Sequence, residues 1–235
     1  MADPREQPAY SVSEAASYLG MPAATLRSWV LGRTYPTTEG EQLFQPLVEV
    51  ADKKHRRLSF YNLVEAFTLN AMRRTNHRVS MPSIRKALNY VKRRLGEPCP
   101  LLTEKFLTDG VDLFLEKYGE LVTVSKDGQL AMRAIMMDSL KHIVRDNKGM
   151  PQKLYLFSSP SAGSENGSAK TAVVIDPRIA FGNPVVDGTG VSTAILAQRY
   201  KAGDSIDELA EDFGLTRHAI EEAIRYEVIP LRKAA

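Results

Sequence analysis

The sequence has few of the features that extracellular, membrane and metal-binding proteins need. Cys99 is the single cysteine among 235 residues, so no intramolecular disulfide can form. No apolar run approaches the roughly 18–20 residues of a membrane-spanning helix, and no signal peptide opens the chain. The four histidines are scattered without the spacing of metal ligands. We therefore expect a cytoplasmic protein that has no membrane segment, no metal site and no cofactor.

Groups of residues that would carry catalysis are also missing. No nucleophile–base pair, glycine-rich phosphate loop or cluster of metal ligands stands out. Glu116 could form a carboxylate pair with Glu120 or with Asp112, but exposed acids on a surface hairpin are the favoured interpretation. The sequence therefore predicts a binding protein and not an enzyme.

Charge, by contrast, is plentiful and unevenly distributed. Residues 1–100 hold 15 Lys/Arg against 9 Asp/Glu, and the rest of the chain holds 16 against 19. A basic surface binds a polyanion because it releases the condensed counterions. The sequence therefore predicts a nucleic-acid contact in the first half and a different role for the second half.

Residues 10–30 have the pattern of two short helices joined by a tight turn. Ser11 and Glu14 have the spacing of a capping box at the start of the first helix. Gly20 supplies the positive φ that ends this helix, and Pro22 suits the first turn of the next one. Four apolar residues recur at helical spacing and form the inner face of the first helix: Val12, Ala15, Ala16 and Leu19.

The second helix has a surface that suits the major groove of DNA. Leu26 and Val30 point inward, which leaves small and hydroxylated residues and one arginine outside. The predicted DNA contacts are Ala24, Thr25, Arg27 and Ser28. For Trp29 two interpretations stay open: its N–H reaches a phosphate, or the ring is purely structural. For the whole stretch, the competing interpretation is an αα-hairpin in a core.

A basic run follows the two helices. Leu47 and Val50 alternate with polar residues, which predicts two short strands around a basic turn within residues 47–58. Such a wing grips phosphates beside the groove that the helix reads. The predicted phosphate contacts are Lys53, Lys54, Arg56 and Arg57. The Thr/Gly-rich stretch before the wing, residues 32–41, is predicted to be a loop.

Two motifs carry a resemblance to a known family. T-L-R-S-W at residues 25–29 and L-S-F-Y-N-L-V-E-A-F at residues 58–67 resemble the winged-helix domain of MerR-type regulators, over residues 10–75. The apolar spacing beyond the wing predicts further helices over residues 60–74 and 80–95.

From Leu101 onward the apolar period changes from 3.6 to 2. Asp109-Gly110 and Asp127-Gly128 lie between alternating apolar runs, which is the pattern of a β-hairpin. We therefore predict hairpins over residues 105–115 and 121–132, a helix over 131–144 and a strand over 153–157. Together they form a small α+β unit packed on the winged domain.

The last part of the chain repeats the helix–turn–helix outline. The Ser/Gly/Ala-rich residues 158–171 read as a flexible linker, which allows the last domain to be positioned independently. A strand is predicted over residues 173–175, and helices over 193–201, 206–213 and 217–227. The predicted fold class is thus α+β and mainly helical. The predicted units are a winged-helix domain (1–79), a middle unit (80–157) and a C-terminal helix–turn–helix-like module (172–235).

Motifs of the last two units carry a second resemblance. I-D-P-R-I-A-F-G-N-P-V-V-D-G-T-G-V at residues 175–191 and G-D-S-I-D-E-L-A-E-D-F-G-L at 203–215 resemble the domain-of-unknown-function family DUF433, which is associated with bacterial antitoxins. L-T-D-G-V-D-L-F at 107–114 and G-Q-L-A-M at 128–132 resemble the longer VapB-like members. The resemblance implies a type II antitoxin that represses its own operon and neutralises a PIN-like ribonuclease. The alternative is a stand-alone MerR-like transcriptional regulator whose other half senses a ligand or a protein.

The second helix–turn–helix outline is predicted to bind protein and not DNA. Residues 172–235 hold 7 Lys/Arg against 10 Asp/Glu, and Glu221, Glu222 and Glu227 on the last helix would repel phosphates. The tail beyond that helix is apolar and then basic. Its predicted contacts with the toxin are Ile229, Leu231, Arg232 and Lys233. A dimer contact competes for this surface, and a homodimer is expected on double-stranded operator DNA because inverted half-sites match two-fold proteins.

Overall fold

The computed structural model describes residues 2–37, 40–73, 81–122, 124–156 and 173–228. Helices α1 (Val12–Tyr18) and α2 (Ala23–Leu31) form the predicted helix–turn–helix. The Ser11 hydroxyl accepts a hydrogen bond from the Glu14 amide at 3.2 Å, and the Glu14 carboxylate accepts one from the Ser11 amide at 2.8 Å. Gly20 has a φ of 61°, as the turn requires. Pro22 stands one position earlier than predicted, at the N-cap of α2.

The wing lies elsewhere than the sequence predicts. Gly32, with a φ of 76°, leads from α2 into strand β1 (Arg33–Thr37), which pairs antiparallel with β2 (Gly40–Phe44). The expected loop at 32–41 is thus mostly hairpin, and the two strands expected within 47–58 are wrong. There one isolated bridge joins Leu58 to Tyr10, and another joins Asp52 to Arg57. Amides of the segment before it bond to the Trp29 carbonyl and the Asn62 side chain instead of to a partner strand.

The predicted hairpins of the middle unit are also wrong. After α3 (Phe60–Arg73), α4 (Met81–Leu95) and a 3-10 turn (Pro100–Leu102), a π-helical turn (Phe106–Gly110) runs into α5 (Val111–Leu121), and α6 (Lys126–Leu140) follows. Gly128 lies in the first turn of α6, where its amide donates to the Ser125 cap at 3.1 Å. The reason is helical spacing of buried residues: Phe114 and Tyr118 on α5, and Met132 and Met136 on α6.

One four-stranded antiparallel sheet crosses the predicted domain boundary. Its order is β3 (Ile143–Arg145), β4 (Pro151–Tyr155), β5 (Val173–Ile175) and β6 (Val185–Val186). Leu154 of β4 is opposite Ile175 of β5. The predicted linker, 158–171, lies outside the described residues, but the strands on either side of it are paired. The last module is therefore attached to the sheet and not independently positioned.

The C-terminal module has the predicted helices. A 3-10 turn (Ala180–Gly182) precedes α7 (Thr193–Ala202), α8 (Ile206–Phe213) and α9 (Arg217–Val228). Ser205 and Glu208 form the expected capping box at α8, and left-handed glycines follow α7 and α8. The small core of this module consists of Val186, Leu196, Leu209, Ile220, Ala223 and Ile224.

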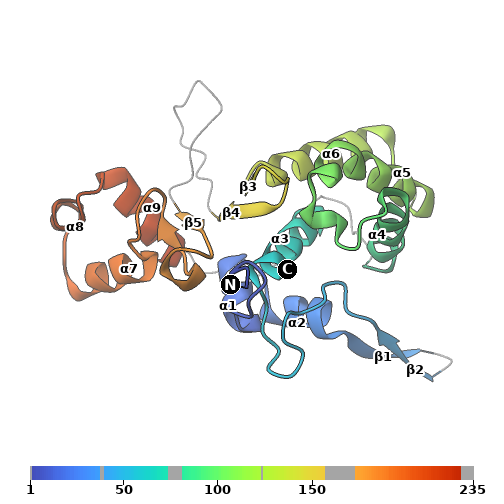
Figure 1. Ribbon diagram of the computed structural model, residues 1–235, viewed down its shortest axis with the longest axis horizontal. Helices are drawn as coiled ribbons and strands as arrows, with labels where there is room; N and C mark the ends of the chain where they lie inside the picture. Colours follow the sequence, from blue (N-terminus) through green and yellow to red (C-terminus); the bar gives the residue numbers. More distant parts are fainter. Residues whose placement is uncertain (1, 38–39, 74–80, 123, 157–172, 229–235) are drawn as a thin grey trace.

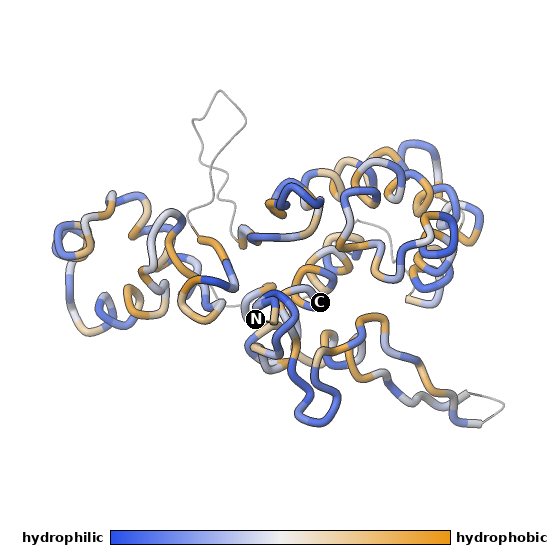
Figure 2. Tube along the Cα trace, viewed as in Figure 1, coloured by the Kyte–Doolittle hydropathy of each residue, from blue (hydrophilic) through white to orange (hydrophobic). Residues whose placement is uncertain are grey.

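The N-terminal helix–turn–helix and the C-terminal module lie side by side. In Figure 1, α1 and α2 lie near the centre, the α3–α6 helices lie on one side and α7–α9 on the other, while the β1–β2 hairpin projects outward. The main core extends from α1 to β5 and includes Trp29, Phe60 and Phe114. Figure 2 shows hydrophobic stretches along α3 and β5, which belong to this core. Within the described ranges, no helix is both long and apolar enough to cross a membrane.

Candidate nucleic-acid interface

Helix α2 presents the predicted residues on its outer side. Ala24 and Arg27 are exposed, and Thr25 and Ser28 are partly exposed. The Ser28 hydroxyl donates to the Thr25 carbonyl at 2.8 Å, so this donor is used within the helix. The structure thus places these four side chains on one accessible surface, and their contact with DNA stays a prediction.

Trp29 has a different environment. Its side chain belongs to the core and the residue is 1% exposed. The Arg73 guanidinium lies 5.6 Å from the ring centroid, and the Trp29 carbonyl accepts from the Leu47 and Val48 amides at 2.6 and 3.2 Å. Because the indole is enclosed, the structural interpretation fits it and a phosphate contact does not.

The basic loop, residues 53–57, is a closed turn. Asp52 and Arg57 exchange backbone hydrogen bonds of 3.1 and 3.0 Å across its base. The backbone amide and Nδ1 of His55 lie 2.9 and 2.7 Å from the Asp52 carboxylate, and these bonds hold the pKa of Asp52 below its usual value. Arg56 takes a left-handed φ of 56° at the tip. The turn therefore fixes where its cations stand.

Asn62, in the first turn of α3, anchors the chain before the basic loop, and sequence analysis did not identify this role. Its Oδ1 accepts from the Ala51 and Ser59 amides at 3.0 and 3.1 Å, and its Nδ2 donates to the Glu49 carbonyl at 2.9 Å. On the other side of the loop, the Leu58 amide donates to the Tyr10 carbonyl at 2.8 Å. The loop is thereby tied to both α3 and the start of α1. The capping spacing of Ser59 and Asn62 was the available signal.

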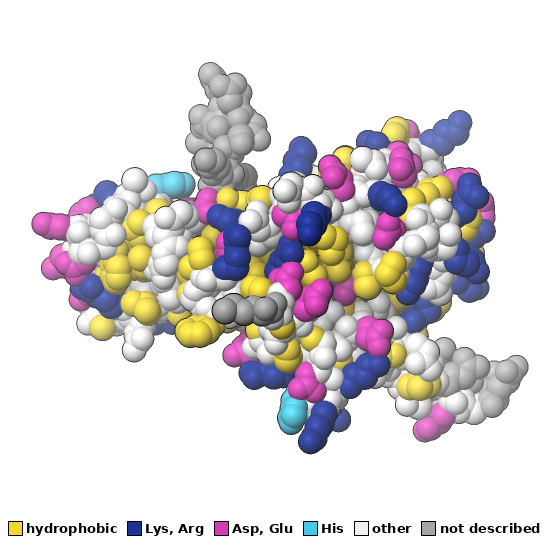
Figure 3. Space-filling view, viewed as in Figure 1, with side chains coloured by type: hydrophobic (Ala, Val, Ile, Leu, Met, Phe, Trp, Pro, Cys, Tyr) yellow, Lys and Arg dark blue, Asp and Glu magenta, His cyan; other side chains and the backbone are white. Residues whose placement is uncertain are grey.

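The cations of the basic loop are largely available to a polyanion. Lys53 pairs with Glu49 at 2.6 Å, but both side chains are exposed and such pairs are weak. In the part of the chain that the structure describes, no carboxylate lies within ion-pair distance of Lys54, Arg56 or Arg57. Figure 3 shows Lys and Arg side chains around a histidine at the lower edge of the molecule, where this loop projects.

The hairpin and the basic loop divide the roles that the sequence assigned to one wing. Hairpin β1–β2 has the shape of a wing but carries Arg33, Glu41 and an exposed Leu43. The basic loop carries the charge but has no paired strands beyond its single bridge. The phosphate-binding potential therefore lies in the loop, and the hairpin extends the surface beyond the end of α2.

The second helix–turn–helix has its arginines neutralised. Arg217 pairs with Asp207 and lies 3.9 Å from Glu221, and Arg225 pairs with the buried Glu222. These cations are already matched by carboxylates, so they release few counterions on approaching DNA. The predicted toxin contacts lie outside the described residues: Ile229, Leu231, Arg232 and Lys233.

The motif at 175–191 has a role that its local pattern does not show: it docks the C-terminal module on α1. The Tyr10 hydroxyl donates to the Gly182 carbonyl at 3.1 Å, and the Tyr18 hydroxyl donates to Asn183 Oδ1 at 3.0 Å. A Cβ on Gly182 would lie 2.2 Å from the Tyr10 hydroxyl, so this contact requires glycine. The buried Asp176 carboxylate accepts from Arg178 at 2.9 and 2.6 Å and stiffens the same segment.

Two families match separate parts of the chain. Residues 8–88 match the family described as "Putative DNA-binding HTH domain", and residues 173–226 match "Protein of unknown function (DUF433)". The DUF433 resemblance and the DNA-binding helix–turn–helix are thereby confirmed. The finer assignment to MerR-type regulators stays a prediction.

Relatives from Mycobacterium tuberculosis are similar to this chain over nearly its whole length. The chain is 24% identical to "Uncharacterized protein Rv2308", over 92% of this chain and 89% of that protein. The crystal structure of Rv2018 has a TM-score of 0.65 and 27% identity, over 93% of this chain and 97% of that one. "Putative antitoxin VapB45" is 31% identical over 92% of both chains. This protein therefore belongs to the family that includes the protein named putative antitoxin VapB45.

Proposed function

We propose that this protein is the antitoxin of a type II toxin–antitoxin system. In this proposal its N-terminal half binds and represses its own operator, and its C-terminal module neutralises a PIN-like ribonuclease, with no catalytic activity of its own. The family and the helix–turn–helix domain support DNA binding by an antitoxin. The repressor role, the PIN-like partner, the homodimer and the cytoplasmic location belong to the proposal alone.

The basic loop is the observation that carries the DNA-binding part. It holds exposed cations beside the helix–turn–helix on a turn that is fixed at both ends. Phosphate contacts set the position of a protein on DNA, and base contacts from a recognition helix set the sequence. In this assignment Lys54, Arg56 and Arg57 contact the backbone, while α2 enters the major groove with Arg27 at a base edge.

The C-terminal module has the surface of a protein-binding unit. Six large hydrophobic side chains stand out as exposed in the described ranges, and four of them belong to this module: Phe181, Ile195, Tyr200 and Val228. Phe181 is 94% exposed, on a left-handed backbone with a φ of 56°. Exposed aromatic residues are common anchors at protein interfaces. These features support a protein partner for the module.

A separation-of-function experiment tests the proposal with full-length protein. Lys54→Ala/Arg56→Ala/Arg57→Ala should lose most binding to the DNA upstream of its own reading frame and still co-purify with the neighbouring ribonuclease. Phe181→Ser should weaken co-purification and protection, and leave DNA binding intact. If the triple variant loses the ribonuclease, or Phe181→Ser loses only DNA, the assignment of roles to the two halves is wrong.

The stand-alone regulator is the second candidate because a cavity of about 570 Å³ lies between the helix–turn–helix domain and the middle unit. A ligand-sensing regulator would bind its DNA without any co-purifying ribonuclease. Absence of such a partner in pull-downs from its natural host, with DNA binding intact, would favour this candidate.

A further inference from the structure

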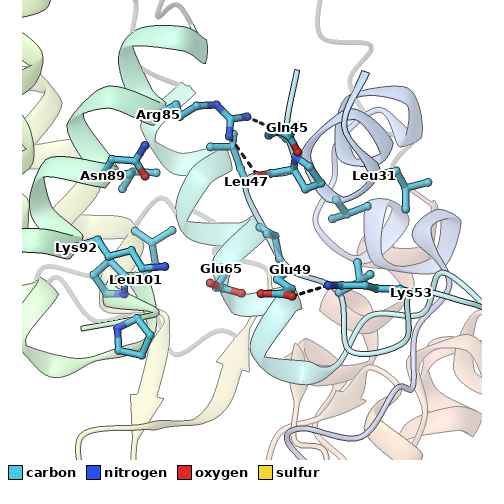
Figure 4. A pocket seen from close by; sticks show the side chains of 17 residues that line it. Leu31, Gln45, Leu47, Glu49, Lys53, Glu65, Arg85, Asn89, Lys92 and Leu101 are labelled. Carbon is cyan, nitrogen blue, oxygen red and sulfur yellow. Dashed lines mark hydrogen bonds and ion pairs between the residues drawn. The ribbon is translucent and has the colours of Figure 1, made fainter. Parts of the chain in front are cut away.

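The cavity lies between the DNA-binding half and the helices of the middle unit. Its volume of about 570 Å³ is within the range of small-molecule sites. The end of α2 and the segment 45–50 form one wall, and α4 and residues 98–101 form the other. Figure 4 shows the side chains that line it, with Glu65 of α3 between the two walls. A ligand here would touch both parts of the molecule at once.

Glu65 is the unusual group in this cavity. The residue is 8% exposed, and its Oε2 accepts one long hydrogen bond, 3.3 Å, from Asn62 Nδ2. No described residue donates a hydrogen bond to its Oε1. Burial raises the pKa of Glu65 to about 7, because an ionised carboxylate is poorly solvated in these surroundings. A carboxyl group with so little compensation has capacity for a further donor.

None of the cations that line the cavity forms an ion pair with Glu65. Arg85 donates to the Pro46 carbonyl at 3.2 Å, and Lys53 pairs with Glu49 at 2.6 Å. Lys92 is exposed and forms no ion pair with Glu65, although its charge lowers the pKa of this carboxyl group. Figure 4 shows the carboxylates of Glu49 and Glu65 close together. Glu49 raises the pKa of Glu65, and Lys92 lowers it without forming an ion pair, so the carboxyl group of Glu65 has a carboxylate neighbour and no bound cation among the described residues.

We infer that this cavity binds a small organic amine whose ammonium group contacts Glu65. An ammonium group would donate a hydrogen bond to Glu65 and place a positive charge in direct contact with it. The apolar part of the ligand would rest on side chains such as Val48, Leu88 and Leu101, which also line the cavity. The inference stands independently of the toxin assignment, because it rests on the cavity alone.

A head-group series tests the inference on the full-length protein. Three probes share one phenyl-ethyl body: 2-phenylethylamine, 2-phenylethanol and 3-phenylpropionate. In calorimetric titrations the amine should bind saturably and about tenfold more tightly than the other two, which is the usual strength of a charge-assisted hydrogen bond. Equal binding of the alcohol, tighter binding of the carboxylate, or no saturable binding of the amine would overturn the inference.

Two variants tie the binding to this site. Glu65→Gln should weaken the amine about tenfold and leave the alcohol unchanged, while Glu49→Gln, at the exposed carboxylate, should change the amine affinity much less. Leu88→Trp fills part of the cavity, keeps the Glu65 carboxyl group and should weaken all three probes. Unchanged amine binding in both Glu65→Gln and Leu88→Trp would place the amine elsewhere and refute the site. If one variant fails to fold, the other decides alone.

Discussion

The two helix–turn–helix units of the chain share the same capping and turn residues but have different surface charges. A Ser/Glu capping box opens α1 and α8, and a glycine with positive φ forms each turn. In the N-terminal unit a basic loop stands beside the second helix without carboxylate partners for Lys54, Arg56 and Arg57 among the described residues. In the C-terminal unit Arg217 and Arg225 are paired with carboxylates. The helix–turn–helix outline therefore specifies the fold and not the partner, and we propose that the unpaired charges decide whether the unit binds DNA.

The largest expected effect on stability comes from disrupting the contact between Tyr10 and Gly182, which joins the two units. Gly182→Ala places a Cβ 2.2 Å from the Tyr10 hydroxyl and requires alanine to adopt a φ of 78°. Overpacking and the unfavourable φ together should cost about 3 kcal/mol in the free energy of unfolding. Gly188→Ala is the matched control, since its φ is 76° and nothing lies within 4 Å of the added Cβ. Equal losses in denaturant melts of the two variants would show that the contact contributes nothing.

The next effect concerns Asn62, which anchors the basic loop of the N-terminal unit. Asn62→Ala removes the bonds to the Ala51 and Ser59 amides and to the Glu49 carbonyl. Leaving these groups unpaired should cost about 2–3 kcal/mol of stability, and DNA affinity should fall because the basic loop loses its fixed position. Asn62→Asp keeps the acceptor and should retain more of both. An unchanged DNA affinity in a folded Asn62→Ala protein would show that loop position is unimportant.

A buried glutamate in each half extends the comparison. Glu222 pairs with Arg225, whereas Glu65 has no cation within ion-pair distance. Since the folded pKa of Glu65 is about 7 and its ordinary value is 4.5, ionisation opposes folding progressively as the pH rises from 4.5 to 7. Glu65→Gln should therefore stabilise the protein at pH 8 by about 2–3 kcal/mol and by little at pH 4. Glu222→Gln should bring no such gain. A Glu65→Gln protein that is not stabilised at pH 8 would contradict this environment for the carboxyl.

The smallest expected effect distinguishes a base contact of Arg27 from a phosphate contact. If Arg27 contacts a base edge, Arg27→Ala should cost about 1–3 kcal/mol on the cognate site and little on random duplexes. Competition binding with both kinds of DNA measures the difference. An equal loss on both would make Arg27 a phosphate contact.

Local signals predicted well where the physics is local. Capping boxes and apolar spacing predicted α1, α3, α8 and α9 nearly to their ends, because a few neighbouring residues decide a helix start. The α2 surface and the basic residues of the loop were accessible to the same reasoning. Asp109-Gly110 and Asp127-Gly128 led to the wrong prediction of hairpins. A turn-forming pair is tolerated inside or at the start of a helix when tertiary packing buries the flanking residues.

The rest depended on contacts between residues far apart in sequence. The contact of Tyr10 with Gly182 and the pairing of β4 with β5 have no local signature, so the attachment of the last module could not be predicted. Glu65 likewise reads as an ordinary helical glutamate until the cavity around it is known. DNA binding is supported separately by the match of residues 8–88 to a family of putative DNA-binding domains.

A salt titration distinguishes the cations of the basic loop, which we propose bind DNA, from the arginines of the C-terminal module, which we propose do not. A random-sequence duplex suffices, because counterion release is independent of sequence. For Lys54→Ala/Arg56→Ala/Arg57→Ala, the slope of log K against log salt should fall by about 2–3 units. Arg199 of α7 pairs with Asp204 and Asp212, as Arg217 and Arg225 pair with their carboxylates. The matched triple Arg199→Ala/Arg217→Ala/Arg225→Ala should therefore keep the slope of the unaltered protein. An unchanged slope in the first variant, or the same loss in the second, would contradict the account.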